Sequence, residues 1–340
     1  MKKTGVLLVN LGTPDSPKTG DVRRYLTEFL NDPRVIDINA VGRAILVNGI
    51  IVPFRSPKSA KVYKELWELW GGESPLLTYG KILKDRIQDC FVDDHVTVEL
   101  AMRYQNPSLD SVLARMEKAA YDQIIVLPLF PHYASASSGS AVEKTMKLIH
   151  KWWVIPEVKI ISNFYDHPGY IEAFVDKAKK HDLKKYDHVI FSYHGLPKRQ
   201  LTKAHPELEC ADCDCHKQFK PEYNLCYQNE CYETSRLIAQ QLNLDEADYT
   251  VAFQSRLGRT PWLSPYSDQV VEEFAKKGAK KLLMLSPAFV ADCLETSIEI
   301  GDEYQEIFEE HGGEKVQLVE SLNDSPIWIK AVEDMIRERI

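Results

Sequence analysis

Short apolar segments rich in β-branched residues alternate with longer helical patterns along the whole chain of 340 residues. The predicted strands are Val6–Leu11, Thr97–Met102, Gln123–Pro128, Val158–Ser162, His188–Tyr193, Tyr249–Gln254, Lys281–Leu285 and Val316–Glu320. The helical patterns between them include Asp21–Asn31, Ser108–Ala120, Ile171–His181, Glu233–Leu242 and Tyr266–Lys277. Because strands that are apolar throughout are buried on both faces, this order predicts an α/β fold of parallel sheets flanked by helices.

Two pairs of similar segments divide the chain into halves. VLLVNLGTP at residues 6–14 resembles VIFSYHGLP at 189–197, and IVLPLFPHYASAS from residue 125 resembles LMLSPAFVADCLE from residue 283. Any two strand–helix units can look alike, whereas two pairs in the same order favour a duplication, and both interpretations stay open. We predict two Rossmann-like halves, 1–165 and 166–340, with a ligand cleft between them at the carboxyl ends of the strands and the last helix packed back on the first half.

Composition and missing motifs exclude several functions. The net charge of −8 argues against a nucleic-acid partner. Neither a dinucleotide fingerprint nor a phosphate-binding P-loop occurs, so no nucleotide cofactor is expected. The most apolar run, Ile45–Phe54, is about half the ~20 residues that cross a bilayer. With no export signal at the start either, we expect a cytoplasmic protein with at most a surface contact to a membrane.

A histidine stands where a buried strand ends. In Ser192-Tyr193-His194-Gly195-Leu196-Pro197 the strand runs into a Gly-Pro turn, and the carboxyl ends of parallel strands are where active-site groups lie. Histidine can transfer a proton near neutral pH and can also bind metal ions. The alternative is a structural histidine bonded to a loop carbonyl.

Three glutamates follow another buried strand at intervals of four residues: Glu295, Glu299 and Glu303. On an α-helix they would form one stripe of like charges, which is mildly unfavourable by itself. A solvated acidic face is one explanation. A row of carboxylates that conducts a divalent cation inward, or protons outward, is the other.

Five of the seven cysteines lie within one short polar segment, and this spacing differs from that of a secreted disulfide framework. They are Cys210, Cys213, Cys215, Cys226 and Cys231. Thiolates this close favour Zn²⁺ or an iron–sulfur cluster, and the spacing leaves both open. Reduced thiols without a metal are the remaining alternative.

Basic and aromatic residues accompany the apolar run at Ile45–Phe54. Arginine and lysine at the rim of an apolar pocket suit a flat hydrophobic ligand that bears carboxylates. The residues of this group are Arg55, Lys58, Tyr63, Ser74, Arg103 and Tyr104.

Several longer motifs occur in order: VLLVNLGTP (6–14), NGIIVPFRSPK (48–58), GGESPL (71–76), AMRYQNPS (101–108), SYHGLP (192–197), FQSRLGRTPWLSPYSD (253–268) and SPAFVADCLE (286–295). They resemble the ferrochelatase family over nearly the whole chain. The resemblance implies two chelatase-type domains with a porphyrin cleft between them. It also implies a lyase that inserts Fe²⁺ into protoporphyrin IX, forming protohaem and releasing two protons.

The resemblance also implies residue roles. His194 and Glu295 are the implied catalytic pair facing each other across the macrocycle, and Glu299 and Glu303 continue from Glu295 as an acidic conduit for iron. The predicted porphyrin-binding residues are Leu11, Arg55, Lys58, Tyr63, Ser74, Arg103, Tyr104, Trp262 and Phe289. An apolar lip at residues 36–60 is expected to favour protoporphyrin IX and a peripheral contact with the inner membrane.

The cysteine-rich insertion, residues 200–231, resembles that of bacterial members with an internal [2Fe–2S] cluster. The implied ligands are Cys210, Cys213, Cys215 and Cys226, with Cys231 as the substitute. Two alternative functions remain: a chelatase for another tetrapyrrole such as coproporphyrin III, and an iron–sulfur sensor on an inactive chelatase scaffold. The expected partners are the porphyrin and haem, and both a monomer and a dimer fit the sequence.

Overall fold

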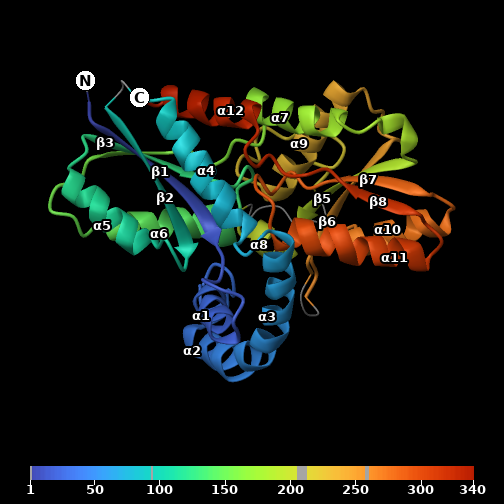
Figure 1. Ribbon diagram of the computed structural model, residues 1–340, viewed down its shortest axis with the longest axis horizontal. Coiled ribbons are helices and arrows are strands. Elements are labelled where there is room, and N and C mark those ends of the chain that lie inside the picture. Colours follow the sequence, from blue (N-terminus) through green and yellow to red (C-terminus); the bar gives the residue numbers. More distant parts are fainter. Residues whose placement is uncertain (1, 93–94, 205–212, 257–259) are drawn as a thin grey trace. The chain divides into compact units, whose positions relative to one another are not determined.

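The computed structural model describes residues 2–92, 95–204, 213–256 and 260–340. The chain divides into two compact units (Figure 1). The first unit comprises Met1–Phe130, Ala134–Asn163 and Val332–Ile340, and the second unit comprises Pro131–Tyr133 and Phe164–Ala331. These units differ from the predicted halves mainly at residues 131–133 and after residue 331, which group with the opposite part of the chain.

A four-stranded parallel sheet forms the centre of the first unit, in the order β2-β1-β3-β4. Its strands are β1 (Thr4–Gly12), β2 (Val96–Tyr104), β3 (Gln123–Pro128) and β4 (Glu157–Ile160). Every residue of β3 is buried, as the continuous apolar run predicts. The register of the central strand β1 places Leu8 beside Leu100 of β2 on one side and beside Leu127 of β3 on the other.

Helices cover this sheet and extend beyond the carboxyl end of β1. They are α1 (Thr19–Leu30), α2 (Ala40–Ala44), the π-helix η1 (Ile45–Ile51), α3 (Val52–Leu69), α4 (Pro75–Asp89), α5 (Leu109–Ala119), the π-helix η2 (Ser135–Gly139) and α6 (Ser140–Ile149). Figure 1 shows α1, α2 and α3 gathered as a helical group at that end of β1. The predicted apolar lip is therefore helical, and not an irregular loop, over most of its length.

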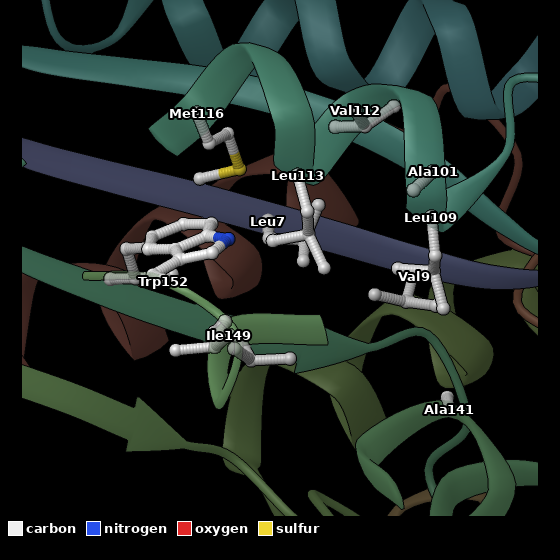
Figure 2. Close-up of a cluster of buried hydrophobic side chains, with 12 residues drawn as sticks. Leu7, Val9, Ala101, Leu109, Val112, Leu113, Met116, Ala141, Ile149 and Trp152 are labelled. Atoms are coloured by element: carbon white, nitrogen blue, oxygen red, sulfur yellow. The ribbon is translucent and has the colours of Figure 1, made fainter. Parts of the chain in front are cut away.

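The core between sheet and helices is made of apolar side chains at helical and strand spacing. Figure 2 shows Leu113 and Met116 of α5 directed at Leu7 of β1, with Trp152 beside Met116. Each such leucine, once fully buried, contributes about 1.5–3 kcal/mol to stability. This packing, more than helix propensity, holds α5 on the sheet.

The second unit has a parallel sheet in the order β6-β5-β7-β8. Its strands are β5 (His188–His194), β6 (Tyr249–Gln254), β7 (Lys281–Leu285) and β8 (Lys315–Leu318). Its helices are α7 (Pro168–Lys179), the short η3 (Leu183–Lys185), α8 (Lys198–Thr202), α9 (Tyr227–Leu242), α10 (Ser267–Lys276), the π-helix η5 (Glu295–Glu303) and α11 (Tyr304–Glu310). The last helix, α12 (Pro326–Arg337), begins in the second unit and from Val332 on belongs to the first.

The two sheets have the same strand order, with β1 equivalent to β5 and β3 equivalent to β7. The similar sequence segments lie on these equivalent strands, so the repeat in sequence is also a repeat in topology. In each sheet the connections run to opposite sides of the central strand. The switch points, between β1 and β3 and between β5 and β7, are where ligands bind in open parallel sheets. The predicted α/β fold is confirmed.

Candidate active site

His194 ends β5 beside the switch point of the second unit, and its backbone pairs with Gln254 of β6. The side chain is half-buried, and its Nδ1 lies 2.7 Å from the carbonyl oxygen of Gly195. Because a carbonyl oxygen can only accept, we assign the proton of the neutral ring to Nδ1. The lone pair is then on Nε2, which can accept a proton or bind a divalent metal ion.

The turn after His194 requires a residue without a side chain. The Gly195 N–H donates to the carbonyl oxygen of Gln254 at 2.8 Å. A Cβ at position 195 would lie 2.8 Å from that same oxygen and 3.3 Å from the Trp262 ring. Trp262, a predicted pocket aromatic, therefore packs against the turn that carries His194.

Glu295 begins the π-helix η5 and is half-buried. The loop before it is held by buried Asp292, whose carboxylate accepts from Thr296 Oγ1 at 3.0 Å and from Asn323 Nδ2 at 2.6 Å. The thiol of Cys293 lies beside Glu295, and burial first, then this carboxylate, raises the pKa of Cys293 well above its usual value. Cys293 is therefore a neutral neighbour of Glu295 near pH 7.

Residues 295–303 form a π-helix, so the four-residue interval of the glutamates does not place them as it would on an α-helix. In the π-helix, hydrogen bonds run between residues five apart, and such segments are rare and often functional. Within this π-helix, the side chain of Glu299 is bound by Gln254 at the end of β6, by the next residue Ser255 and by Tyr304 of α11.

The carboxylate of Glu299 accepts four hydrogen bonds. Gln254 Nε2 donates to Oε2 at 3.0 Å, the Ser255 N–H donates to Oε1 at 3.0 Å, and the Tyr304 hydroxyl donates to Oε1 at 3.0 Å. The fourth donor is Ser255 Oγ, 2.5 Å from Oε2. Glu303 lies farther along η5, and partial desolvation, followed by the charge of Glu299, raises its pKa.

In the first unit, Arg103 and Tyr104 are bound to one buried carboxylate, that of Asp32. Arg103 Nη2 lies 2.5 Å from Asp32 Oδ2, and the Tyr104 hydroxyl donates to the same oxygen at 2.9 Å. Ser140 Oγ donates to it as well, at 2.5 Å. Burial alone would raise the pKa of Asp32, but these donors and the Arg34 N–H outweigh it and lower that pKa. Burial raises the pKa of Tyr104, so its phenol stays protonated.

The structure brings three of the predicted porphyrin-binding residues together in the first unit. Leu11 and Tyr63 pack against the apolar cluster that contains Tyr104. Ser74 is buried at the N-terminus of α4, whereas Arg55 and Lys58 are exposed on α3. In the second unit, half-buried Phe289 lies in the loop between β7 and η5. The assignment of these residues to a porphyrin stays a prediction.

The chain matches the family model described as ferrochelatase over residues 3–340. A ferrochelatase of Legionella pneumophila (strain Corby) is 44% identical to it over 343 aligned positions, which cover 99% of this chain and 100% of the relative. A ferrochelatase of Coxiella burnetii (strain Dugway 5J108-111) is 42% identical, with 99% and 94% covered. The chain belongs to the ferrochelatase family.

Membership in the ferrochelatase family confirms the resemblance inferred from the motifs, and with it a lyase. Solved structures support the fold. SirB from Bacillus subtilis with Fe³⁺ has a TM-score of 0.56 at 11% identity, covering 99% of this chain and 95% of that one. A sirohydrochlorin chelatase SirB of Bacillus subtilis subspecies spizizenii, in complex with cobalt, has a TM-score of 0.54 at 10% identity, with 99% and 94% covered.

Three cysteines of this ferrochelatase-family chain are buried close to one another. Cys215, Cys226 and Cys231 are each at most 5% exposed. Burial is the main cause that raises the pKa of Cys231, and the thiols of Cys226 and Cys215 are near enough to add to it. Cys213 is half-exposed, and Cys210 lies outside the described residues.

Within the described part of the chain, no three metal-binding side chains are close enough to form a ready metal site. The same residues contain no helix long and apolar enough to cross a membrane.

Sequence reasoning missed the residues that position the predicted site. Gln254 and Ser255 lie within the motif at 253–268, but neither they nor Tyr227 were given a role, because their hydrogen-bond partners Glu299 and His194 are distant in the sequence. One signal was present: Gln254 is a polar residue at the end of an apolar strand, a position where a buried amide needs partners.

Proposed function

We propose that this member of the ferrochelatase family inserts Fe²⁺ into protoporphyrin IX to form protohaem, with His194 and Glu295 as the reacting groups. The observation that carries the proposal is the Nδ1 contact of His194 with the Gly195 carbonyl, because it leaves the Nε2 lone pair to act. Glu295 stands in the segment that follows β7, on the other side of the same switch point.

The reaction needs an acceptor for protons and a ligand for iron. Metal insertion replaces two pyrrole N–H protons by one Fe²⁺ ion, so two protons leave and the oxidation state of iron is unchanged. Neutral His194 accepts one proton at Nε2, and a carboxylate is the natural acceptor for the other. The carboxylates of Glu295, Glu299 and Glu303 make this region negative, which draws a divalent cation such as Fe²⁺ from the solvent toward the site.

Exposed apolar side chains in the lip support a hydrophobic porphyrin. Val41 is 71% exposed, Ile45 65% and Phe54 73%. A porphyrin with few carboxylates and a membrane surface both suit such a lip. We therefore propose protoporphyrin IX as the substrate and a peripheral contact of the lip with a membrane.

Metallation assays distinguish the alternatives. Purified protein is incubated without oxygen with Fe²⁺ and either protoporphyrin IX or coproporphyrin III, and haem formation is followed by absorbance. Protohaem formation at the higher kcat/KM supports the proposal. Preference for coproporphyrin III overturns the substrate choice, and no metallation of either porphyrin favours a sensor on an inactive scaffold.

We further propose that the cysteine-rich insertion holds a [2Fe–2S] cluster. The burial of Cys215, Cys226 and Cys231 near one another supports the proposal, because a cluster needs thiol ligands that are shielded from solvent. The proposed ligands remain Cys210, Cys213, Cys215 and Cys226, with Cys231 as the substitute. When bound, such a cluster supplies one-electron redox chemistry and a cross-link between chain segments.

Iron and acid-labile sulfide in equal amounts, at about two of each per chain, would support the cluster. Zinc without sulfide would overturn it. Separate Cys226→Ser and Cys231→Ser variants then show which of the two is a ligand, because only loss of a ligand removes the sulfide.

A further inference from the structure

The carboxylate of Glu299 has donors on all sides. Its two oxygens offer about four lone-pair positions, and four donors occupy them. Iron could bind this carboxylate directly only after some of these hydrogen bonds had broken. Glu299 therefore differs from Glu295, whose neighbouring thiol at Cys293 is a weak donor.

Gln254 supplies one of these donors and is itself fixed at both ends of its amide. The side chain is 2% exposed. Its Oε1 accepts from Ser192 Oγ at 2.7 Å, so Nε2 faces the opposite way. Nε2 then donates both to Glu299 Oε2 and, at 3.1 Å, to the main-chain oxygen of Glu295.

The main chain of Gln254 also holds the histidine turn. It pairs with His194 in the sheet, and its carbonyl oxygen accepts the Gly195 N–H. One buried residue is therefore bonded to the turn that carries His194 and to the first residue of η5.

Ser255 adopts a backbone conformation that L-residues seldom take. Its φ is 63°, in the left-handed region. In this conformation both its N–H and its hydroxyl reach the Glu299 carboxylate. A residue other than glycine stays in this region only where the surrounding structure holds it, and here the two hydrogen bonds from Ser255 to Glu299 offset the cost of the conformation.

We infer that Gln254 and Ser255 are positioning residues that clamp Glu299, and that Glu299 acts as a fixed brace for η5 and not as a ligand that passes iron along. The brace sets where Glu295 stands relative to His194. This inference rests on the proposed roles of His194 and Glu295. The row of glutamates then has separate tasks: Glu295 reacts, Glu299 anchors, and Glu303 is left to attract the cation.

The test is a double-mutant cycle between Gln254→Met and Glu299→Gln, with kcat and KM measured separately for Fe²⁺ and porphyrin. If both act through one brace, each single variant lowers kcat by roughly tenfold or more, and the double variant is no slower than the slower single variant. The KM for porphyrin stays within about twofold, because neither residue is assigned a contact with it.

Controls separate positioning from general loss of structure. Thr250→Val removes a side-chain bond, to His188, near the opposite end of the same strand and should keep the wild-type kcat. Ser255→Ala is the milder second variant, since it removes one donor to Glu299 and keeps the backbone N–H. It should lower kcat in the same direction by a smaller factor, with the folded fraction checked by thermal melting.

Two results would overturn the inference: a wild-type kcat in both Gln254→Met and Ser255→Ala, or effects of Gln254→Met and Glu299→Gln that multiply in the double variant. Multiplying effects would mean that Glu299 acts on iron independently of its clamp. A wild-type protein that metallates no porphyrin would instead overturn the proposed function, and the inference with it.

Discussion

The hydroxyl of Tyr227 donates a hydrogen bond to the main-chain carbonyl of His194 at 2.8 Å. Tyr227 is the first residue of α9 and directly follows Cys226. The bond therefore ties the carboxyl end of β5 to the start of the helix that follows the cysteine-rich insertion. It orients the same peptide segment whose next carbonyl, that of Gly195, fixes the ring of His194.

Removing the Tyr227 hydroxyl should leave the position of His194 less well fixed, while the buried ring still fills its place in the core. In Tyr227→Phe the ring remains, and we expect kcat to fall by roughly tenfold while the free energy of unfolding falls by only about 1 kcal/mol. Steady-state kinetics and urea unfolding measure the two effects. Tyr121→Phe, in the first unit, is the control. Equal kcat values in the two variants would contradict the role of Tyr227.

Gly195 should tolerate no side chain, whereas Gly20 should. A Cβ at 195 meets the Gln254 carbonyl oxygen at 2.8 Å, and that oxygen is main chain held in a sheet. Gly195→Ala must therefore displace the His194 turn, and we expect metallation to fall by at least roughly tenfold. A Cβ at Gly20, within α1, meets nothing within 4 Å. Gly20→Ala should keep full activity, and similar activities in the two variants would refute the close approach at Gly195.

His132 should make the second unit sensitive to acid. Burial lowers the pKa of His132 from 6.5 to about 3. Its Nε2–H donates to the Thr234 hydroxyl, which in turn donates its own proton to the carbonyl oxygen of Tyr165. Its Nδ1 has no hydrogen-bond partner among the residues that the structure describes. The unfolded state therefore binds a proton near pH 6.5 that the folded state refuses, so stability is present above pH 6.5 and is lost as pH falls toward 3.

The expected loss from this one group between pH 7 and pH 5 is roughly 2 kcal/mol. His132→Gln keeps a donor for Thr234 but does not titrate. Its free energy of unfolding should therefore decline less steeply with acid than that of the wild type, by about that amount. Urea unfolding of both proteins at a series of pH values measures the difference, and parallel curves would show that His132 is not held neutral.

Asp32 should stabilise the fold by balancing the buried charge of Arg103 and accepting the hydrogen bond of Tyr104. Asp32→Asn removes the charge that balances Arg103, whose side chain is only 14% exposed, and leaves a buried cation. We expect a loss of about 3 kcal/mol in the free energy of unfolding. Asp110→Asn breaks a comparable pair with Lys144, but there the aspartate is 60% exposed, and less than about 1 kcal/mol should be lost. Equal losses would show that the Asp32 pair is not a buried anchor.

Local sequence pattern was sufficient to locate the strands along the chain. Buried strands of a parallel sheet are apolar over most of their length, so segments such as Gln123–Pro128 and Lys281–Leu285 were predicted with the bounds that the structure shows. The position of His194 followed from the same rule, because a polar residue after such a strand lies at the ligand-binding edge of the sheet.

The bonds between distant segments could not be read from spacing. Glu299 is bound to Gln254, 45 positions away, and these bonds accompany a π-helix where the four-residue interval predicts an α-helix. Arg103 was predicted from its charge as a ligand-facing residue, yet its nearest acid is Asp32, 71 positions away. In each case a buried polar group is bonded to a residue distant in the sequence. Which residues pair in this way depends on the tertiary structure, and local residue spacing does not determine it.

Haem formation by the His194→Ala variant tests the central claim most directly. Wild type, His194→Ala and the exposed-residue control His150→Ala are assayed with Fe²⁺ and protoporphyrin IX without oxygen, after each is shown to be folded. We predict wild-type rates for His150→Ala and at least a roughly 100-fold lower kcat for His194→Ala. Haem formation by folded His194→Ala at the wild-type rate would contradict the assignment of His194 as the proton-accepting residue.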